Sequence, residues 1–170
     1  RAARNSEVSY QFKQQVWSEK RKMKILVSAC VMGQNCKYNG KNNKNVIVQN
    51  YLKDKDIIVM CPEMLAKMPI PRPCAELVSG SVWDENGNCV DAVYRKAVKT
   101  ALHELEDAKI ELAVLQSRSP TCGAKEIYDG TFTGRLIPGY GLFAKALIEK
   151  GYKVVDVEDF AAWVIENSKK

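Results

Sequence analysis

The sequence predicts an α/β fold, with an open, mostly parallel sheet of Rossmann-like type, helices on both faces and one small hairpin insertion. Three observations support this prediction. Short apolar runs of strand length alternate along the chain with segments whose apolar residues recur every three or four positions. The strand-length runs are rich in valine, isoleucine and leucine, which suits strands covered on both faces. The 170 residues also suffice for one domain with its own core, which we expect over residues 23–170.

The first part of this domain contains two predicted strands and a short helix. Residues 25–27 and residues 57–60 are apolar runs that favour buried strands. Between them, a stretch rich in glycine and asparagine over residues 33–45 predicts a loop, and the apolar residues of 45–53 predict a helix. Residues 69–73 contain three prolines, which remove hydrogen-bond donors and fix backbone angles, so we expect no regular structure there.

A turn, a long helix and a strand are predicted in the middle of the chain. Asn86-Gly87 stands between short apolar flanks and predicts the hairpin insertion over residues 81–90. Apolar residues at helical spacing then predict a helix over residues 91–108. Residues 112–115 are a third apolar run and therefore a third predicted strand.

The last part of the chain predicts a loop, a helix, a strand and a final helix. Residues 129–139 are rich in glycine and threonine and are expected to form the loop. A helix at about residues 140–150 should end at Gly151. Residues 154–157 predict a fourth strand, and Asp159 is expected to cap the final helix.

The composition is that of an ordinary soluble globular protein, with 46% hydrophobic and 27% charged residues. No apolar run is long enough to span a bilayer, and the N-terminal stretch lacks the apolar centre of a secretory signal. We therefore expect a cytoplasmic protein without membrane contact. In that reducing compartment, six cysteines indicate metal binding or catalysis rather than disulfides.

The excess of positive charge lies mostly at the N-terminus. The chain carries a net charge of +6, of which +4 falls on residues 1–22, so the rest is close to neutral. A basic arm of this kind can contact RNA, and a weak nucleic-acid contact through residues 1–22 is one interpretation. The interpretation we favour is a solvated or partly disordered extension, non-native if Met23 is the natural start.

Three cysteines follow three predicted strands. Cys30 ends the first strand segment, Cys61 follows the second and Cys122 comes shortly after the third. In open parallel sheets, ligands bind outside the carboxyl ends of the strands. We therefore expect the three thiols to converge at one edge of the sheet and to form a functional site. Cys74 and Cys89 lie in the proline-rich loop and in the predicted hairpin, where we expect them only to pack.

The types of donor present narrow the inorganic centres that these thiols could hold. A structural zinc site takes four ligands, often in paired Cys-x-x-Cys knuckles, and the sequence has no such knuckle. The one histidine, His103, lies on the long predicted helix, where we expect a surface position. Soft sulfur ligands without histidine favour an iron–sulfur cluster, in which three cysteines would leave one iron open. The alternative without a metal is an activated thiolate nucleophile, for which no nearby histidine is evident.

Polar residues beside these cysteines are candidates for proton transfer and substrate contact. Glu63 could act as a general acid or base, or could be a carboxylate that stabilises the start of a helix. Ser119 could donate a hydrogen bond to a developing charge, or could serve as a cap or turn hydroxyl. Arg72 could orient an anionic or carbonyl-bearing ligand, whereas Asp129-Gly130 also fits a simple turn.

Six short motifs follow one another along the chain: Val27-Ser-Ala-Cys30, Gly33-x-x-Cys-Lys-Tyr-Asn-Gly40, Cys61-Pro-Glu63, Pro71-Arg72 with Glu76, Ser119-Pro-Thr-Cys-Gly123, and Tyr128-Asp-Gly-Thr-Phe-Thr-Gly134. Together they resemble the motifs of the thiouracil desulfidase family, compact bacterial proteins long known as a domain of unknown function. The resemblance covers roughly residues 23–159. No single motif is decisive, but the ordered set is specific.

The resemblance implies an enzyme that carries a [4Fe–4S] cluster on three cysteines. Those cysteines would be Cys30, Cys61 and Cys122, with Cys36 as an alternative to Cys61. The open iron would bind the sulfur of a thiolated pyrimidine such as 2-thiouracil. Water would then replace the sulfur at carbon without net redox change, leaving the oxo base and sulfide.

The same resemblance implies catalytic roles for two further residues. Glu63 would handle protons and Ser119 would activate the substrate, and the partner would be a small-molecule thiolated base. Two other functions remain as alternatives, both without catalysis. A zinc-stabilised interaction module would contain zinc rather than iron. An RNA-binding domain would depend on residues 1–22 for its affinity.

Overall fold

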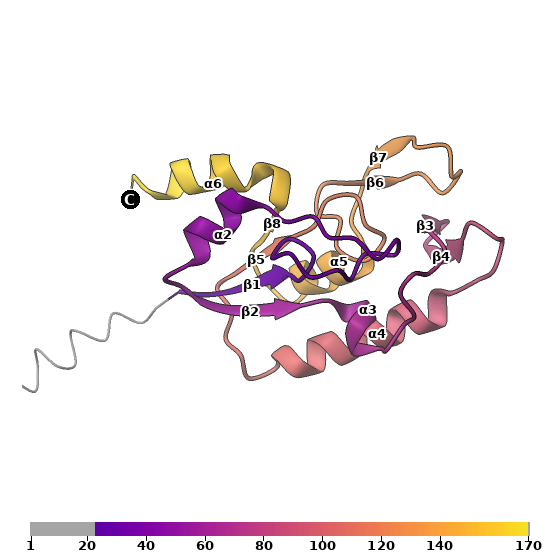
Figure 1. The fold of residues 1–170 in the computed structure, drawn as a ribbon, viewed down its shortest axis with the longest axis horizontal. Helices are drawn as coiled ribbons and strands as arrows, with labels where there is room; N and C mark the ends of the chain where they lie inside the picture. The colour runs from indigo at the N-terminus through magenta and orange to yellow at the C-terminus, as the bar shows by residue number, and fades with distance from the viewer. Residues whose placement is uncertain (1–22, 170) are drawn as a thin grey trace, which may run out of the picture.

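A sheet of four parallel strands lies at the centre of the molecule (Figure 1). The computed structural model describes residues 23–169, so the expectations for the basic extension, residues 1–22, fall outside the described residues. The strand order is β2, β1, β5, β8, and these strands span Asp56–Met60, Lys24–Ser28, Leu112–Leu115 and Val154–Asp156 respectively. Every neighbouring pair is parallel, which confirms the predicted open α/β fold.

The sheet is covered by four helices, α2 (Val46–Leu52), α4 (Asp91–Leu105), α5 (Leu142–Glu149) and α6 (Phe160–Asn167). Ile25 and Val27 of β1 belong to the core formed with α2 and α6, whereas Leu26 belongs to the core formed with α4 and α5. This alternation is the two-residue period of a strand, and it explains why both faces of the sheet need a cover. Figure 1 shows α2 and α6 on one side of the sheet and α4 on the other. Within residues 23–169, no helix has the length and apolarity that crossing a membrane would require.

Two helix ends follow the expected residues, whereas α4 ends at Leu105 and not at residue 108. The side chain of Asn45 caps α2, and Gly151, with a φ of 87°, terminates α5. Asp159 occupies the N-cap position of α6, as predicted, but its side chain makes no capping hydrogen bond. A 3₁₀ turn, η1 (Val157–Asp159), separates β8 from α6, and Asp156 caps this turn instead.

The predicted hairpin forms at a different turn. β3 (Ala75–Val78) and β4 (Ser81–Asp84) are antiparallel and meet at Ser79-Gly80, where both residues have positive φ. Two consecutive residues with positive φ suit a tight hairpin turn. The turn at Asn86-Gly87 also exists, but beyond it the chain makes only an isolated bridge between Trp83 and Cys89. The prediction over residues 81–90 was therefore right about a turn and wrong about the paired strands.

A second hairpin lies where only a loop was predicted. β6 (Glu126–Tyr128) and β7 (Leu136–Pro138) are antiparallel, and they flank most of the glycine- and threonine-rich segment. Each strand has only three residues, too few to produce a clear period in the sequence. The one predicted hairpin insertion is therefore two hairpins, and both lie beyond the carboxyl ends of the parallel strands (Figure 1).

The two hairpins contact each other. The carboxylate of Glu76 on β3 accepts a hydrogen bond from the backbone N–H of Phe132 at 3.1 Å. Gly130 approaches β3 so closely that a Cβ atom there would lie 2.6 Å from the carbonyl oxygen of Leu77. Two segments that are distant in the sequence therefore form one wall over the end of the sheet.

The start of α5 holds the loop that follows β5. The carbonyl oxygen of Thr121 accepts hydrogen bonds from the N–H groups of Phe143 at 2.8 Å and Ala144 at 3.2 Å. Helices leave their first N–H groups unpaired, and here the loop supplies an acceptor for them. Gly141 precedes the helix, and a Cβ atom on it would lie only 2.5 Å from the carbonyl carbon of Thr121. The helix can dock this closely only because residue 141 has no side chain.

We expect Gly141→Ala to lower the free energy of unfolding by about 2–3 kcal/mol, because the added methyl overlaps fixed backbone atoms. Gly139→Ala is the matched control. Its Cβ atom would meet no backbone atom, only the Cδ1 and Cγ1 atoms of the Ile127 side chain at 3.1 and 3.2 Å, and a side chain can move. Urea unfolding followed by circular dichroism measures both variants. Equal losses in the two variants would contradict the assigned role of Gly141.

Candidate active site

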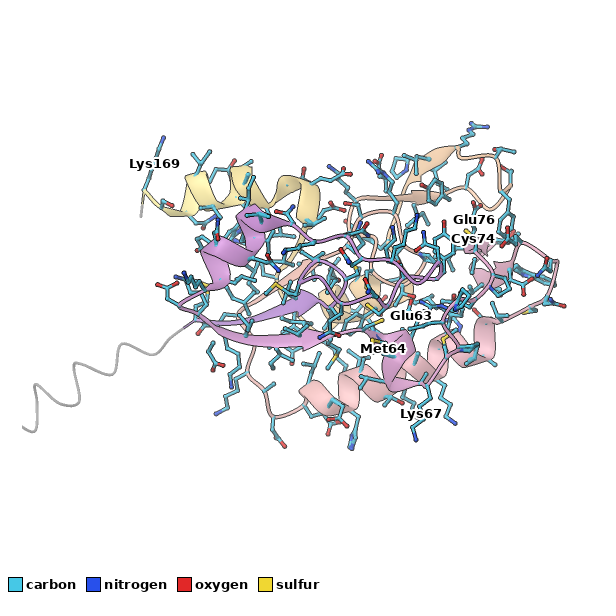
Figure 2. The ribbon with its side chains drawn as sticks, viewed as in Figure 1. Glu63, Met64, Lys67, Cys74, Glu76 and Lys169 are labelled. Atoms are coloured by element: carbon cyan, nitrogen blue, oxygen red, sulfur yellow. The ribbon has the colours of Figure 1, made fainter. Side chains whose placement is uncertain are left out.

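A cavity of about 460 Å³ lies at the carboxyl ends of β1, β2 and β5. Residues that follow each of these strands line it, together with residues of both hairpins and of α4. In Figure 2, Glu63 lies at this end of the sheet, Glu76 lies on the β3–β4 hairpin and Cys74 lies just before it. The volume is typical of a small-molecule site, and the position is where open parallel sheets bind ligands.

The structure brings the three predicted thiols to this cavity. Cys30 follows β1, Cys122 lies in the loop after β5, and Cys61 is the residue just before the short helix α3 (Pro62–Leu65). Cys30 and Cys122 are buried, with 9% and 7% of their surface exposed, and Cys61 is half-buried. Their convergence follows from the strand order, because β1 lies between β2 and β5.

Two further cysteines line the same cavity. Cys36 is 2% exposed, and its thiol forms hydrogen bonds with the thiols of both Cys30 and Cys61. Cys74, which we expected only to pack, also lines the cavity, because it leads directly into the unpredicted strand β3. Cys89 is exposed on the surface, away from the cavity lining.

The buried thiols resist ionisation when no metal is bound. Burial raises the pKa of Cys122 well above that of an ordinary thiol, and the charge of Glu63 raises it further. The hydrogen bond with Cys30 is the largest cause that raises the pKa of Cys36 to about 11. The hydrogen bond with Cys36, followed by burial, raises the pKa of Cys61. These thiols stay protonated at neutral pH, so a metal centre would have to displace their protons.

The chemistry of these donors distinguishes between a cluster and a single ion. Ligands of one zinc ion must meet around one point, and no group of three or more His, Cys, Asp or Glu side chains within residues 23–169 does so. His103 is exposed on α4, as expected. A four-iron cube is wider than one ion and takes thiolates that stand further apart. The lining offers five cysteine thiols and no histidine, which fits an iron–sulfur cluster and gives no support to the zinc alternative.

Glu63 is a buried carboxylate held at both oxygens. It lies in the first turn of α3 and is 7% exposed. Oε2 accepts a hydrogen bond from the thiol of Cys61 at 3.2 Å, and Oε1 accepts one from the hydroxyl of Thr121 at 2.6 Å. Thr121 is fully buried, and no local sequence pattern indicates this contact, since 58 positions separate Thr121 from Glu63.

The hydroxyl of Ser119 organises the loop that carries Cys122. Its oxygen accepts hydrogen bonds from the N–H groups of Thr121 at 3.0 Å and Cys122 at 3.1 Å. This is the turn role, one of the two alternatives expected for Ser119 from the sequence. The hydroxyl hydrogen is not used in these bonds, so Ser119, which lines the cavity, can still donate to a ligand.

Arg72 and Tyr94 also line the cavity, and the guanidinium of Arg72 donates to the carbonyl oxygen of Cys36 at 3.3 Å. Arg72 comes from the proline-rich segment, which has no regular secondary structure, as predicted. Tyr94 lies on α4 and is 5% exposed, and the charge of Arg72 acts on its hydroxyl. Tyr94 was missed because it lies within the helical pattern of apolar residues that faces the core.

Comparisons with known proteins agree with these observations. Residues 25–159 match the model of a protein family described as 2-thiouracil desulfurase. An uncharacterized protein of Bacillus subtilis (strain 168), YbbK, is 31% identical over 141 residues. That match covers 77% of this chain and 93% of the relative.

A solved structure is also similar. The [4Fe-4S]-dependent thiouracil desulfidase TudS superposes with a TM-score of 0.77 at 29% sequence identity. The similarity covers 88% of this chain and 100% of that one.

Because the raised pKa values reduce the thiolate fraction at any given pH, alkylation should be selective in the folded, metal-free chain. We expect iodoacetamide at about pH 8 to modify the exposed Cys89 first and to leave Cys36, Cys61 and Cys122 largely unmodified. Raising the pH towards 11 should accelerate the reaction at Cys36, whose pKa is about 11. Peptide mass spectrometry gives the rates. Similar rates at Cys36 and Cys89 at the lower pH would contradict the described burial.

Proposed function

We propose that this chain, which belongs to the 2-thiouracil desulfurase family, replaces the sulfur of a thiolated pyrimidine by oxygen and releases the sulfur as sulfide. The observation that carries the proposal is the meeting of three strand-end thiols and a buried carboxylate in one cavity of small-molecule size. The overall reaction consumes one water and exchanges C=S for C=O. Carbon and sulfur keep their oxidation states, so no external oxidant or reductant is needed.

Three cysteines hold the cofactor in this proposal. Cys30, Cys61 and Cys122 are the ligands of a [4Fe–4S] cluster, the cofactor on which the similar TudS depends. When bound by only three thiolates, such a cluster has one iron with an open position, which can take the sulfur of the substrate. Cys36 is then a thiol beside two ligands rather than a ligand itself, and it remains the alternative to Cys61.

Glu63 and Ser119 supply the proton chemistry of the proposal. A water that attacks the thiolated carbon must lose a proton, and Glu63 is a carboxylate in the cavity that can accept it. The hydrogen bond from Thr121 fixes the orientation of this carboxylate. Ser119 donates its free hydroxyl hydrogen to the negative charge that develops on the substrate.

The substrate in this proposal is a free base, because the cavity has the volume of a small-molecule site. Contact between RNA and residues 1–22 remains a prediction from the sequence. The expected compartment is the cytoplasm, where reduced thiols are available to bind iron.

Alanine variants test the ligand assignment. After anaerobic reconstitution, the wild-type chain should hold about four iron atoms and release uracil and sulfide from 2-thiouracil. Cys30→Ala, Cys61→Ala and Cys122→Ala should each lose the visible absorption of the cluster and the activity. Cys89→Ala is the matched control, since Cys89 lies on the surface, and it should keep both.

Cys36→Ala decides between the two possible third ligands. We expect it to retain iron, because Cys61 completes the set. If Cys36→Ala loses the iron while Cys61→Ala keeps it, Cys36 is the third ligand. Iron and sulfide analysis per chain distinguishes these results without any measurement of turnover.

Glu63→Gln tests the proton role separately from cofactor binding. The amide has nearly the same shape but cannot take a proton, so kcat should fall by about 100- to 10,000-fold. The iron content should stay at the wild-type level. Glu104→Gln, on the exposed side of α4, is the control and should leave kcat unchanged. A normal kcat for Glu63→Gln would exclude this residue as the acid or base.

A further inference from the structure

Arg72 lies in the wall of the cavity with its hydrogen-bonding capacity largely unused. Its guanidinium donates to the carbonyl oxygens of Cys36 at 3.3 Å and Pro69 at 3.5 Å, both longer than a good N–H···O hydrogen bond. Its Nε atom is buried and has no partner among the described residues. A guanidinium carries five N–H donors; the hydroxyl of Tyr94 also interacts with this group, but the buried Nε still lacks an acceptor among the described residues.

The charge of Arg72 is not neutralised by an ion pair. Within residues 23–169, no carboxylate lies within ion-pair distance of it, whereas Arg118, which also lines the cavity, pairs with Glu126 and Glu158. Burying a cation costs free energy when it has no counter-ion and its N–H groups lack acceptors, unless a ligand supplies an acceptor. The two arginines of the cavity therefore differ: Arg118 is held by protein carboxylates, and Arg72 lacks an acceptor.

The backbone keeps Arg72 in place. Its own N–H donates to the carbonyl oxygen of Tyr38 at 2.8 Å, which ties the proline-rich segment to the loop after β1. Tyr94 on α4 lies beside the guanidinium, and its burial raises the pKa of its hydroxyl, so the phenol stays neutral. The position thus presents a fixed cation and a neutral hydroxyl to the same cavity as the thiols.

We propose that Arg72 is the residue that selects the substrate, by donating hydrogen bonds to a ring carbonyl of the thiolated pyrimidine. The inference rests on the proposed desulfurase function and extends it to the rest of the substrate ring. With the sulfur directed to the thiols, the carbonyl two ring positions away is the acceptor that Arg72 lacks. The preferred substrates are therefore keto-thiopyrimidines, such as 2-thiouracil.

An amino group at the same ring position cannot replace the carbonyl. Arginine has donors only, so an exocyclic amine would place donor against donor and would leave the cation without an acceptor. Sites built to bond a polar group discriminate strongly against analogues that lack it, because their own buried groups are left unpaired. One hydrogen bond to a charged group corresponds to about a 10- to 100-fold preference.

The test compares 2-thiouracil with 2-thiocytosine, which carries an amine in place of the carbonyl, on the reconstituted holoenzyme. We expect kcat/KM of the wild type to favour 2-thiouracil by about 10- to 100-fold. Arg72→Met should lose most of this preference, with a fall in kcat/KM for 2-thiouracil and a change of less than about threefold for 2-thiocytosine. Arg72→Lys keeps one charged donor and should retain part of the preference, even if Arg72→Met folds poorly.

Arg95→Met is the matched control. Arg95 pairs with Asp91 on the surface of α4 and lies outside the cavity lining. The preference of the Arg95→Met variant for 2-thiouracil over 2-thiocytosine should therefore equal that of the wild type. Iron content and thermal unfolding of every variant identify any loss that is merely structural. A wild type without preference, or an equal fall for both substrates in Arg72→Met and Arg72→Lys, would overturn the inference.

A binding measurement separates this inference from the proposed function. Equilibrium dialysis of uracil and cytosine against the same proteins reports recognition without any reaction. If 2-thiouracil is not turned over but uracil still binds more tightly than cytosine in an Arg72-dependent way, the proposed function fails and the role of Arg72 stands. If turnover occurs and neither assay shows a dependence on the carbonyl, the function stands and the role of Arg72 fails.

Discussion

The hydrogen bonds of Thr121 join the fold to the site. Its carbonyl oxygen accepts hydrogen bonds from the second and third N–H groups of α5, its own N–H donates to Ser119, and its hydroxyl donates to Glu63. The residue is completely buried, so water cannot substitute for any of these partners. One side chain and one peptide unit thus fix the helix, the cysteine loop and the carboxylate relative to each other. The geometry of the cavity is therefore as stable as the packing of α5.

The parallel sheet concentrates groups that are unfavourable on their own. Buried thiols, a buried carboxylate and an unpaired guanidinium gather at one end of the strands, where they cost stability in the empty protein. A bound iron–sulfur cluster would offset the stability cost of the buried thiols, because the cysteines bind it as thiolates, without their protons. A ligand carbonyl would likewise offset the cost of the guanidinium of Arg72, because it would accept the hydrogen bonds that this group does not make within the protein. The site is therefore more stable with its cofactor and ligand bound than without them. The apolar cores on both faces of the sheet stabilise the fold against the cost of the empty site.

The sequence predicted what depends on local pattern. The four strands are apolar runs, and Cys30, Cys61 and Cys122 could be placed together because the ends of parallel strands share one edge. The hairpins could not be placed in the same way, because Ser79 adopts a positive φ that its residue type does not announce, while Asn86-Gly87 forms a turn with almost no pairing. Thr121 and Tyr94 could not be predicted as site residues, since each contacts residues that lie far away along the chain. No pattern within a few residues marks such a contact.

The joined hairpins have a consequence for attempts to engineer this scaffold. Glu76 on one hairpin holds the backbone of the other, and Gly130 occupies a space that no side chain could share with Leu77. A chimera that imports one hairpin from a relative would break this match and leave a buried carboxylate without its donor. The two segments therefore form one exchangeable module, although 51 positions separate the start of β3 at Ala75 from the start of β6 at Glu126. Grafts that move both together are the ones that preserve the cavity.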